Sequence, residues 1–167
     1  NIPADINDPK TRFSYARMGT YYCRMSNDHD KQLVVMTRSE SWIVDKDGKP
    51  GMHNPGSPSG IDGCGMPMFH LGRDPENPIY GLEYGRELEF IRRFPPERID
   101  AQTSELRRGG RTLRVVMRPK GDSVESIELL YDGKSQKVRY LTWDDRVPVD
   151  MAVFVPPQSV KYAEMRD

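Results

Sequence analysis

The chain has 167 residues, a length at which proteins usually build one domain around a single core, so we do not expect a two-domain enzyme. Lys and Arg total 25 and Asp and Glu total 25, which makes the formal net charge zero. A neutral chain has no overall field that attracts polyanions, and this argues against nucleic acid as a partner. Only 36% of the residues are hydrophobic, while glycine and proline number 14 each, so we expect a loop-rich globular fold.

The first residues and the hydrophobic pattern bear on where the protein acts. The chain starts at Asn1 rather than Met, and residues 1–9 have neither the basic nor the apolar region of a signal peptide. We interpret it as an exported chain without its targeting segment, or as a fragment, with residues 1–10 as an N-terminal extension. No apolar run approaches the roughly 18 residues of a transmembrane helix, so we expect no transmembrane span.

Cys23 and Cys64 are the only cysteines. In an oxidising compartment they can form a disulfide that closes a loop of about 40 residues and stabilises the fold by roughly 3–4 kcal/mol. The alternative is one buried thiol in a strand and one unrelated thiol in a loop. Both readings remain open from the sequence.

Alternating side chains predict strands in the first part of the chain. Between residues 12 and 25 one parity carries apolar side chains, which indicates a half-buried strand interrupted at Gly19. These apolar side chains are Phe13, Tyr15, Tyr21, Cys23 and Met25. Further strands are expected at 33–37 and 41–45, so the three form an antiparallel meander that ends at the Asp47-Gly48 turn.

Glycine and proline dominate residues 48–67, and we expect a long loop there without a helix or an inner strand. A loop of this length in a compact domain is functional or mobile. A short apolar patch follows at 66–71. Beyond it, apolar residues at helical spacing predict a helix at 83–93, which Pro95-Pro96 ends.

The second half returns to strand patterns separated by glycine-containing turns. A hairpin connection over 107–111 and a turn at Asp132-Gly133 are expected. The predicted strands are 99–106, 112–118, 124–131, 138–143 and 151–155. The whole pattern therefore predicts a mainly β fold with one helix.

No catalytic motif is found, so we expect no enzyme and no cofactor. The sequence lacks a nucleophile elbow, a phosphate-binding loop, a dinucleotide fingerprint and a His-Glu-x-x-His zinc helix. The carboxylate pairs Asp144-Asp145 and Glu87/Glu89 are interpreted as solvated side chains. No metal site is predicted, because the only candidate ligands fit no standard zinc spacing, and they are kept as a weaker hypothesis. These candidates are His53, Cys64 and His70.

Four arginines cluster around the predicted hairpin at 107–111: Arg107, Arg108, Arg111 and Arg114. They can contact a phosphate, a lipid head group or an acidic partner, or they can form a solvated turn that discourages edge pairing, which we favour. The chain also has 9 methionines. They either line an adaptable cavity or simply fill the core.

The order of these elements resembles a known family. The first group of motifs is Phe13-Ser14-Tyr15, Leu33-Val34-Val35, the 41–45 strand with its central Trp42, and Asp47-Gly48. The second group is a strand ending in Pro119-Lys120, then Ile127-Glu128-Leu129, Asp132-Gly133 and a closing Phe154-Val155-Pro156-Pro157 followed by Val160. In this shared order the chain resembles the periplasmic lipoprotein carriers, the LolA-like family of outer-membrane lipoprotein-sorting proteins.

The resemblance implies a mainly β (α+β) fold with a strongly curved antiparallel sheet, an unclosed half-barrel with one or two covering helices. It implies a single domain over 11–167 and a non-enzymatic, periplasmic protein that takes part in transport. The partner would be a lipid or a lipid-modified protein. Acyl chains would bind by burial in an apolar groove, at about 0.8 kcal/mol per methylene.

On this reading, side chains from several strands line the ligand groove: Phe13, Tyr15, Val35, Trp42, Val44, Val116, Leu129 and Leu141. Met68, Phe69 and Leu71 resemble the short lid helix of the family. The alternative is a structural or interaction subunit of a cell-envelope assembly. Its groove would be filled with side chains, and its exposed sheet edges and the 48–67 loop would contact a protein partner.

Overall fold

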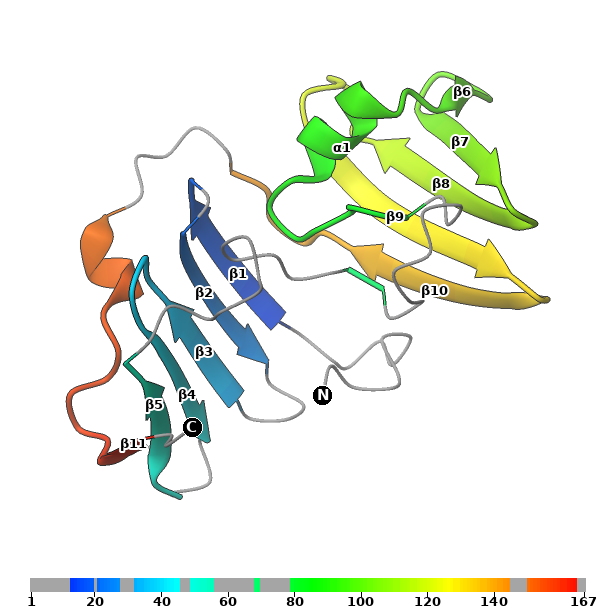
Figure 1. Ribbon diagram of the computed structural model, residues 1–167. Helices are drawn as coiled ribbons and strands as arrows, with labels where there is room; N and C mark the ends of the chain where they lie inside the picture. Colours follow the sequence, from blue (N-terminus) through cyan, green and yellow to red (C-terminus); the bar gives the residue numbers. More distant parts are fainter. Residues whose placement is uncertain are drawn as a thin grey trace. The chain divides into compact units, whose positions relative to one another are not determined.

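The computed structural model describes residues 13–19, 21–27, 32–45, 49–55, 68–69, 79–144 and 150–164. This part of the chain is mainly β, with two sheets and one short α-helix (Figure 1). The chain divides into two compact units. The six-stranded unit comprises 9–65 and 147–167, and the five-stranded unit comprises 1–8 and 66–146. The single domain expected over 11–167 stays a prediction.

The six-stranded sheet has the order β1-β2-β3-β4-β5-β11. Its strands are β1 (Phe13–Met18), β2 (Tyr22–Asn27), β3 (Gln32–Met36), β4 (Ser41–Asp45), β5 (Gly51–Asn54) and β11 (Tyr162–Glu164). Neighbours from β1 to β5 are antiparallel, which confirms the predicted meander, and β11 pairs with β5 in parallel. The predicted interruption at Gly19 is the β1–β2 turn, where this glycine has a φ of 59°.

Two predictions for this unit are wrong. The 48–67 loop contains an inner strand, β5, because its four residues after Pro50 include no proline and pair with Ser41–Ile43. The strand expected at 151–155 is a 3-10 helix, η1 (Met151–Phe154). Its local cause is Asp150, whose side chain accepts a hydrogen bond from the backbone N–H of Ala152 at 3.0 Å and so caps the helix.

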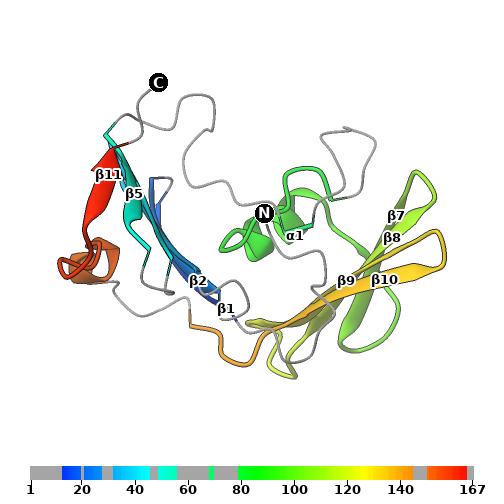
Figure 2. The ribbon, with the colours of Figure 1, turned by 90° about the horizontal axis from the view of Figure 1, so that it is seen from below.

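The five-stranded sheet has the order β10-β9-β8-β7-β6 and is antiparallel throughout. Its elements are α1 (Glu87–Arg93), β6 (Glu97–Arg98), β7 (Thr103–Arg108), β8 (Arg111–Met117), β9 (Val124–Tyr131) and β10 (Lys134–Arg139). The predicted helix is confirmed, although it begins later than expected, after Gly85 with its φ of 79°. Figure 2 shows α1 on one side of this sheet.

The last strand of this sheet starts earlier than the expected 138–143. Asp132 and Gly133 have φ values of 47° and 70°, which suit a two-residue hairpin turn. The turn therefore brings Lys134 directly opposite Tyr131, and β10 begins there.

Each unit has its own hydrophobic core. In the six-stranded unit a cluster of buried side chains around η1 comprises Leu33, Val35, Val44 and Phe154. Buried side chains of the five-stranded unit include Met68, Phe69, Ile79, Leu82, Phe90, Leu113, Val115, Val124, Ile127, Leu129 and Val138. The expected single, strongly curved half-barrel is wrong for the described strands, because they form two sheets and neither is closed or strongly curled. No helix in the described part is long and apolar enough to cross a membrane.

Candidate functional site

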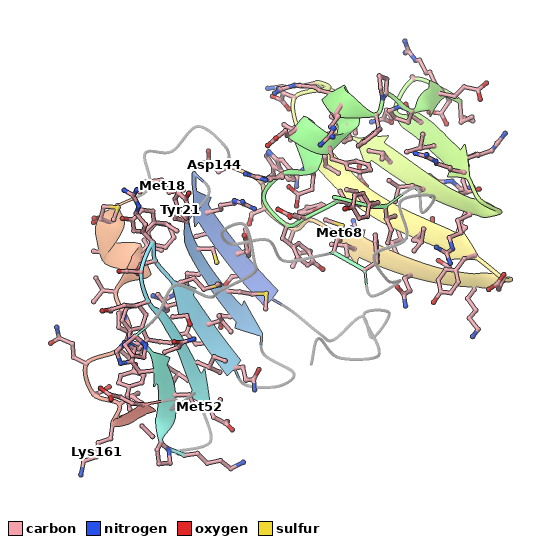
Figure 3. All side chains as sticks on the ribbon, in the orientation of Figure 1. Met18, Tyr21, Met52, Met68, Asp144 and Lys161 are labelled. Atoms are coloured by element: carbon pink, nitrogen blue, oxygen red, sulfur yellow. The ribbon has the colours of Figure 1, made fainter. Side chains whose placement is uncertain are left out.

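One face of the six-stranded sheet carries a row of partly exposed apolar side chains. Residues paired across neighbouring strands lie on the same face of a sheet. The register therefore aligns, from β1 to β5, Tyr15, Met25, Val34, Ile43 and Met52. All five are at least partly exposed, and Met52, labelled on β5 in Figure 3, is 42% exposed. We call these five residues the apolar row.

The opposite face is filled by the chain itself. Val35 and Val44 are 0% and 5% exposed, and they form a buried cluster with Phe154 of η1, which is 2% exposed. Partly buried side chains pack against this cluster: Ala16, Met18, Tyr22, Trp42, Val153, Val160 and Tyr162. The groove predicted on the face that carries Val35 and Val44 is therefore occupied by η1 and the segment after it.

Polar and aromatic contacts fix η1 over this face. Arg24 on β2 donates a hydrogen bond to the backbone carbonyl of Val153 at 3.1 Å. The rings of Tyr22 and Phe154 lie 5.8 Å apart. Met18, which Figure 3 labels beside η1, packs against the same cluster. Because both contacts link β2 to a segment far along the chain, η1 is a fixed part of the core.

The segment after η1 closes the remaining part of this face. Tyr162 on β11 donates a hydrogen bond to the carbonyl of Pro157 at 3.0 Å. Its ring lies over Gly51, where an added Cβ would come within 2.7 Å of ring carbons. Glycine at the start of β5 thus allows the close approach of β11.

Trp42 and His53 form a stacked pair on this same face. Their rings are 5.1 Å apart and inclined by only 5°. Nε2 of His53 lies 3.7 Å from Oε2 of Glu40. The contacts link β4 to β5 and give Trp42 a structural role beside the filled core.

The remaining predicted groove residues do not meet on one surface. Tyr15 belongs to the apolar row, and Phe13 lies in β1. Val116 pairs with Thr103 and Ser126 on the polar face of the five-stranded sheet, while Leu129 is fully buried on its other face. Leu141 follows β10 and is 65% exposed.

The lid predicted from the resemblance takes another form. Met68 and Phe69 are buried, at 0% and 3% exposure, in the five-stranded unit. They form a bend, and the N–H of Met68 donates to the carbonyl of Leu82 at 3.1 Å. Leu71 lies outside the described residues. At these two positions the backbone is a bend and not the expected helix, and the lid role of Met68, Phe69 and Leu71 stays a prediction.

The predictions on cysteine and metal chemistry fall partly outside the described residues. Cys23 is fully buried in β2, whereas Cys64 and His70 are not described, so the disulfide stays a prediction. Among the described His, Cys, Asp and Glu side chains, no group of three or more can hold a metal ion.

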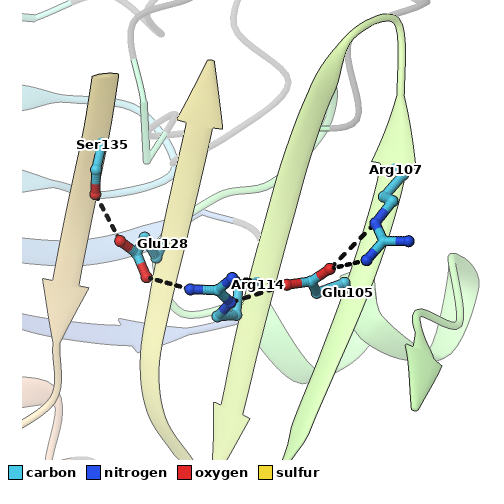
Figure 4. A network of polar contacts seen from close by, with 5 residues as sticks. All are labelled: Glu105, Arg107, Arg114, Glu128 and Ser135. Atoms are coloured by element: carbon cyan, nitrogen blue, oxygen red, sulfur yellow. Dashed lines mark hydrogen bonds and ion pairs between the residues drawn. The ribbon is translucent and has the colours of Figure 1, made fainter. Parts of the chain in front are cut away.

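The polar face of the five-stranded sheet carries a network of charged side chains (Figure 4). Arg114 donates to Glu105 at 2.9 Å and to Glu128 at 3.5 Å. Arg107 donates to the second oxygen of Glu105 at 2.6 Å, and Ser135 donates to Glu128 at 2.6 Å. Hydrogen bonds from Arg107 and then Arg114 hold the pKa of Glu105 below its usual value.

Two of the clustered arginines are thus partnered by carboxylates of their own sheet. Arg107 and Arg114 both contact Glu105, so their charges are largely balanced within the network. The favoured solvated-turn interpretation of this cluster agrees with these pairs.

A buried carboxylate marks the start of α1, so the interpretation of Glu87 as a solvated side chain is wrong. Glu87 is 3% exposed and accepts hydrogen bonds from the O–H of Tyr140 at 2.8 Å and the N–H of Gly85 at 3.0 Å. Burial, and then the charge of Glu87, raise the pKa of both Tyr84 and Tyr140. We assign this cluster a structural role because it ties the helix to the end of β10.

Sequence reasoning missed four members of the apolar row: Met25, Val34, Ile43 and Met52. One signal was available, since Met25 shares its parity with Tyr15 across the interrupted strand. The sequence did not determine which face of β3 carries the candidate site, because Val34 and Val35 are both apolar. No protein-family model and no curated protein sequence matches this chain.

Proposed function

We propose that this chain is a non-enzymatic, periplasmic protein that resembles lipoprotein carriers and binds acyl chains, or a lipid-modified protein, on the six-stranded sheet. The binding surface is the apolar row, and not the groove predicted from the sequence. The single observation that carries the proposal is this continuous row of partly exposed apolar side chains across five neighbouring strands.

The length of the row suits a linear hydrocarbon. It crosses five strands, which at the usual spacing between strands spans about 19 Å. An extended long-chain acyl group has a similar length. Burial of methylene groups along the row stabilises the complex by about 0.8 kcal/mol each before the cost of ordering the chain.

The borders of the row favour a narrow ligand. On β4, Asp45 and Ser41 lie on the same face on either side of Ile43, and on β5 Asn54 lies next to Met52. Over β4 these polar side chains restrict the apolar surface to one side chain in width, whereas on β3 Met36 widens it beside Val34. Met25 and Met52 add flexible thioethers, which adapt to chains of different shape.

Binding of a fluorescent fatty acid to paired variants tests the proposal. Val34 lies in the apolar row on β3. Val116 lies on β8 of the five-stranded sheet and is, like Val34, a partly exposed valine in a strand. We expect Val34→Asn to weaken binding about tenfold or more, because a polar amide replaces an apolar contact. Val116→Asn is the matched control and should bind like the unchanged protein.

The binding results show which of the two sheets binds the probe, and the displacement results identify the ligand. Equal loss in both variants, or no binding by the unchanged protein, would overturn the proposal. Displacement of the probe by a triacylated lipopeptide indicates a lipid-modified protein as cargo, whereas displacement only by phospholipid indicates a lipid. Circular dichroism of each variant confirms that it is folded.

The second candidate is a structural or interaction subunit of a cell-envelope assembly. It is favoured by the filling of the predicted groove by Phe154 and its neighbours, which leaves the sheet edges and the apolar row as contact surfaces. It predicts that a protein partner from the envelope binds in the absence of lipid, and that Val34→Asn weakens this complex while no fatty acid binds.

A further inference from the structure

The described methionines differ sharply in how far solvent reaches their thioethers. Met52 is 42% exposed and Met151 is 47% exposed, whereas Met68 is fully buried. Figure 3 labels Met52 on β5 and Met68 in the five-stranded unit. Met52 belongs to the apolar row, while Met151 lies on η1, which covers the opposite face of the same sheet. The two exposed thioethers are therefore equally open to solvent, but only one belongs to the proposed binding surface.

We propose that the thioether of Met52 is a site of oxidation by peroxides, and that its oxidation weakens the binding of acyl chains. The effect on binding rests on the proposed function. With hydrogen peroxide, a lone pair of the sulfur attacks one oxygen, so that an S–O bond forms and the O–O bond breaks. The sulfur is oxidised by two electrons and the peroxide is reduced. The hydroxide that leaves takes the proton of the new S–OH group and becomes water, and methionine sulfoxide remains.

The neighbours of Met52 leave its side chain open. Ile43 lies opposite it on β4, and Ala163 lies opposite it on β11. Ala163 is itself exposed, and its single methyl group is too short to cover the thioether. Met25, the other methionine of the apolar row, lies between Tyr15 and Val34 and is only partly exposed. The β5 end of the row is therefore the part that an oxidant reaches most easily.

A sulfoxide at this position interrupts the apolar row. Its oxygen is a hydrogen-bond acceptor, and contact with a hydrocarbon removes its water without supplying a donor, which is unfavourable. The row is only one side chain wide over the neighbouring strand β4, so an acyl chain that follows it to the end meets Met52. Oxidation thus shortens the usable row by one strand spacing, about 4.8 Å, and fewer methylenes are buried. The fold should persist, because Met52 is outside the buried cluster around Phe154.

Two variants with matched exposure test the site. Met52→Leu and Met151→Leu each remove one exposed thioether and keep an apolar side chain of similar size. The unchanged protein and both variants are treated with hydrogen peroxide, and peptide mass spectrometry follows each methionine with time. We expect Met52 to be oxidised at least about tenfold faster than buried Met68, because oxidation follows exposure.

Binding of the fluorescent fatty acid is then measured before and after treatment, while Met68 is still intact. We expect peroxide to raise the dissociation constant about fivefold or more in the unchanged protein and in Met151→Leu. In Met52→Leu it should rise less than about twofold, since leucine has no sulfur to oxidise. Circular dichroism after treatment confirms that each protein is folded.

The possible failures are distinguishable. Oxidation of Met52 no faster than that of Met68 overturns the modification site, and this measurement needs no lipid. Equal loss of binding in Met52→Leu and Met151→Leu, or no loss in the unchanged protein, overturns the control of binding by Met52 and leaves the proposed function standing. If the untreated protein binds no fatty acid, the proposed function fails, and the effect on binding fails with it. The oxidation rates still decide the modification site in that case.

Discussion

The O–H of Tyr140 donates a hydrogen bond of 2.8 Å to the carboxylate of Glu87, which lies 53 positions earlier in the chain. The acceptor is 3% exposed, and its second donor is the N–H of Gly85. A buried carboxylate is costly unless donors surround it. The contact therefore stabilises the start of α1 against the residues after β10.

Removal of this hydroxyl should destabilise the five-stranded unit. We expect Tyr140→Phe to lower the free energy of unfolding by about 1–3 kcal/mol, because it leaves a buried carboxylate without one donor. Trp143 is the reporter, since its ring lies 5.0 Å from that of Tyr140. A Trp42→Phe background removes the other tryptophan, so urea unfolding followed by fluorescence reports this unit alone.

A second tyrosine of the same unit is the control for this loss. Tyr131→Phe removes a hydroxyl from the end of β9, where the side chain is partly exposed. It should change the free energy of unfolding by less than about 0.5 kcal/mol. Equal effects of the two substitutions would contradict the role given to the buried contact.

The same contact predicts an alkaline limit of stability. The pKa of Tyr140 is raised above its usual value of 10.0 by burial and by Glu87, so the folded chain keeps a proton that the unfolded chain releases. The stabilisation is complete below pH 10 and falls as pH rises toward the folded-state pKa. Each such tyrosine lowers the free energy of unfolding by about 1.4 kcal/mol per pH unit.

Unfolding of the unchanged protein and of Tyr140→Phe should be compared between pH 9 and 11.5. Other alkaline groups are common to both proteins, so their contribution cancels in the difference. We expect the unchanged protein to lose stability more steeply above pH 10. Parallel curves would show that this phenol titrates normally in the folded chain.

Glu105 predicts the opposite dependence at acid pH. Its pKa lies below the usual 4.5 because Arg107 and Arg114 donate hydrogen bonds to it. The stabilisation is therefore present above pH 4.5 and is lost as pH falls through the folded-state pKa. We expect Glu105→Gln to be less stable at pH 7 but to lose less stability on acidification. Glu89→Gln, with a side chain that is 70% exposed, is the control and should follow the unchanged protein.

Local patterns in the sequence predicted the elements whose cause is local. The alternation around Gly19 and along 41–45 indicated strands, and the apolar spacing before Pro95 indicated the helix. The glycine-rich turns also located most of the second sheet, since these turns fix hairpins within a few residues.

Elements that depend on distant partners were missed. β5 has only four residues after a proline, and β11, with which it pairs in parallel, lies more than a hundred residues away. The prediction of the candidate site from the sequence failed for the same reason. β3 has apolar side chains on both faces, Val34 and Val35. Only residues from near the end of the chain, Phe154 and its neighbours, determine which face is filled.

The contact between Gly51 and Tyr162 carries the last prediction. An added Cβ at Gly51 would lie 2.7 Å from two ring carbons of Tyr162 and 3.1 Å from Cγ1 of Val160. The ring cannot swing away freely, because its hydroxyl donates to Pro157. We therefore expect Gly51→Ala to lower the free energy of unfolding of the six-stranded unit by about 1–3 kcal/mol, the usual cost of overpacking.

A double-mutant cycle identifies the ring as the cause. Tyr162→Ala destabilises the unit by itself, but it removes the obstructing carbons, so Gly51→Ala should cost clearly less in that background. Fluorescence of Trp42, in a Trp143→Phe background, reports this unit during urea unfolding. If Gly51→Ala costs the same with and without the ring, the ring of Tyr162 is not the cause of the destabilisation, and the proposed packing of β11 against Gly51 is incorrect.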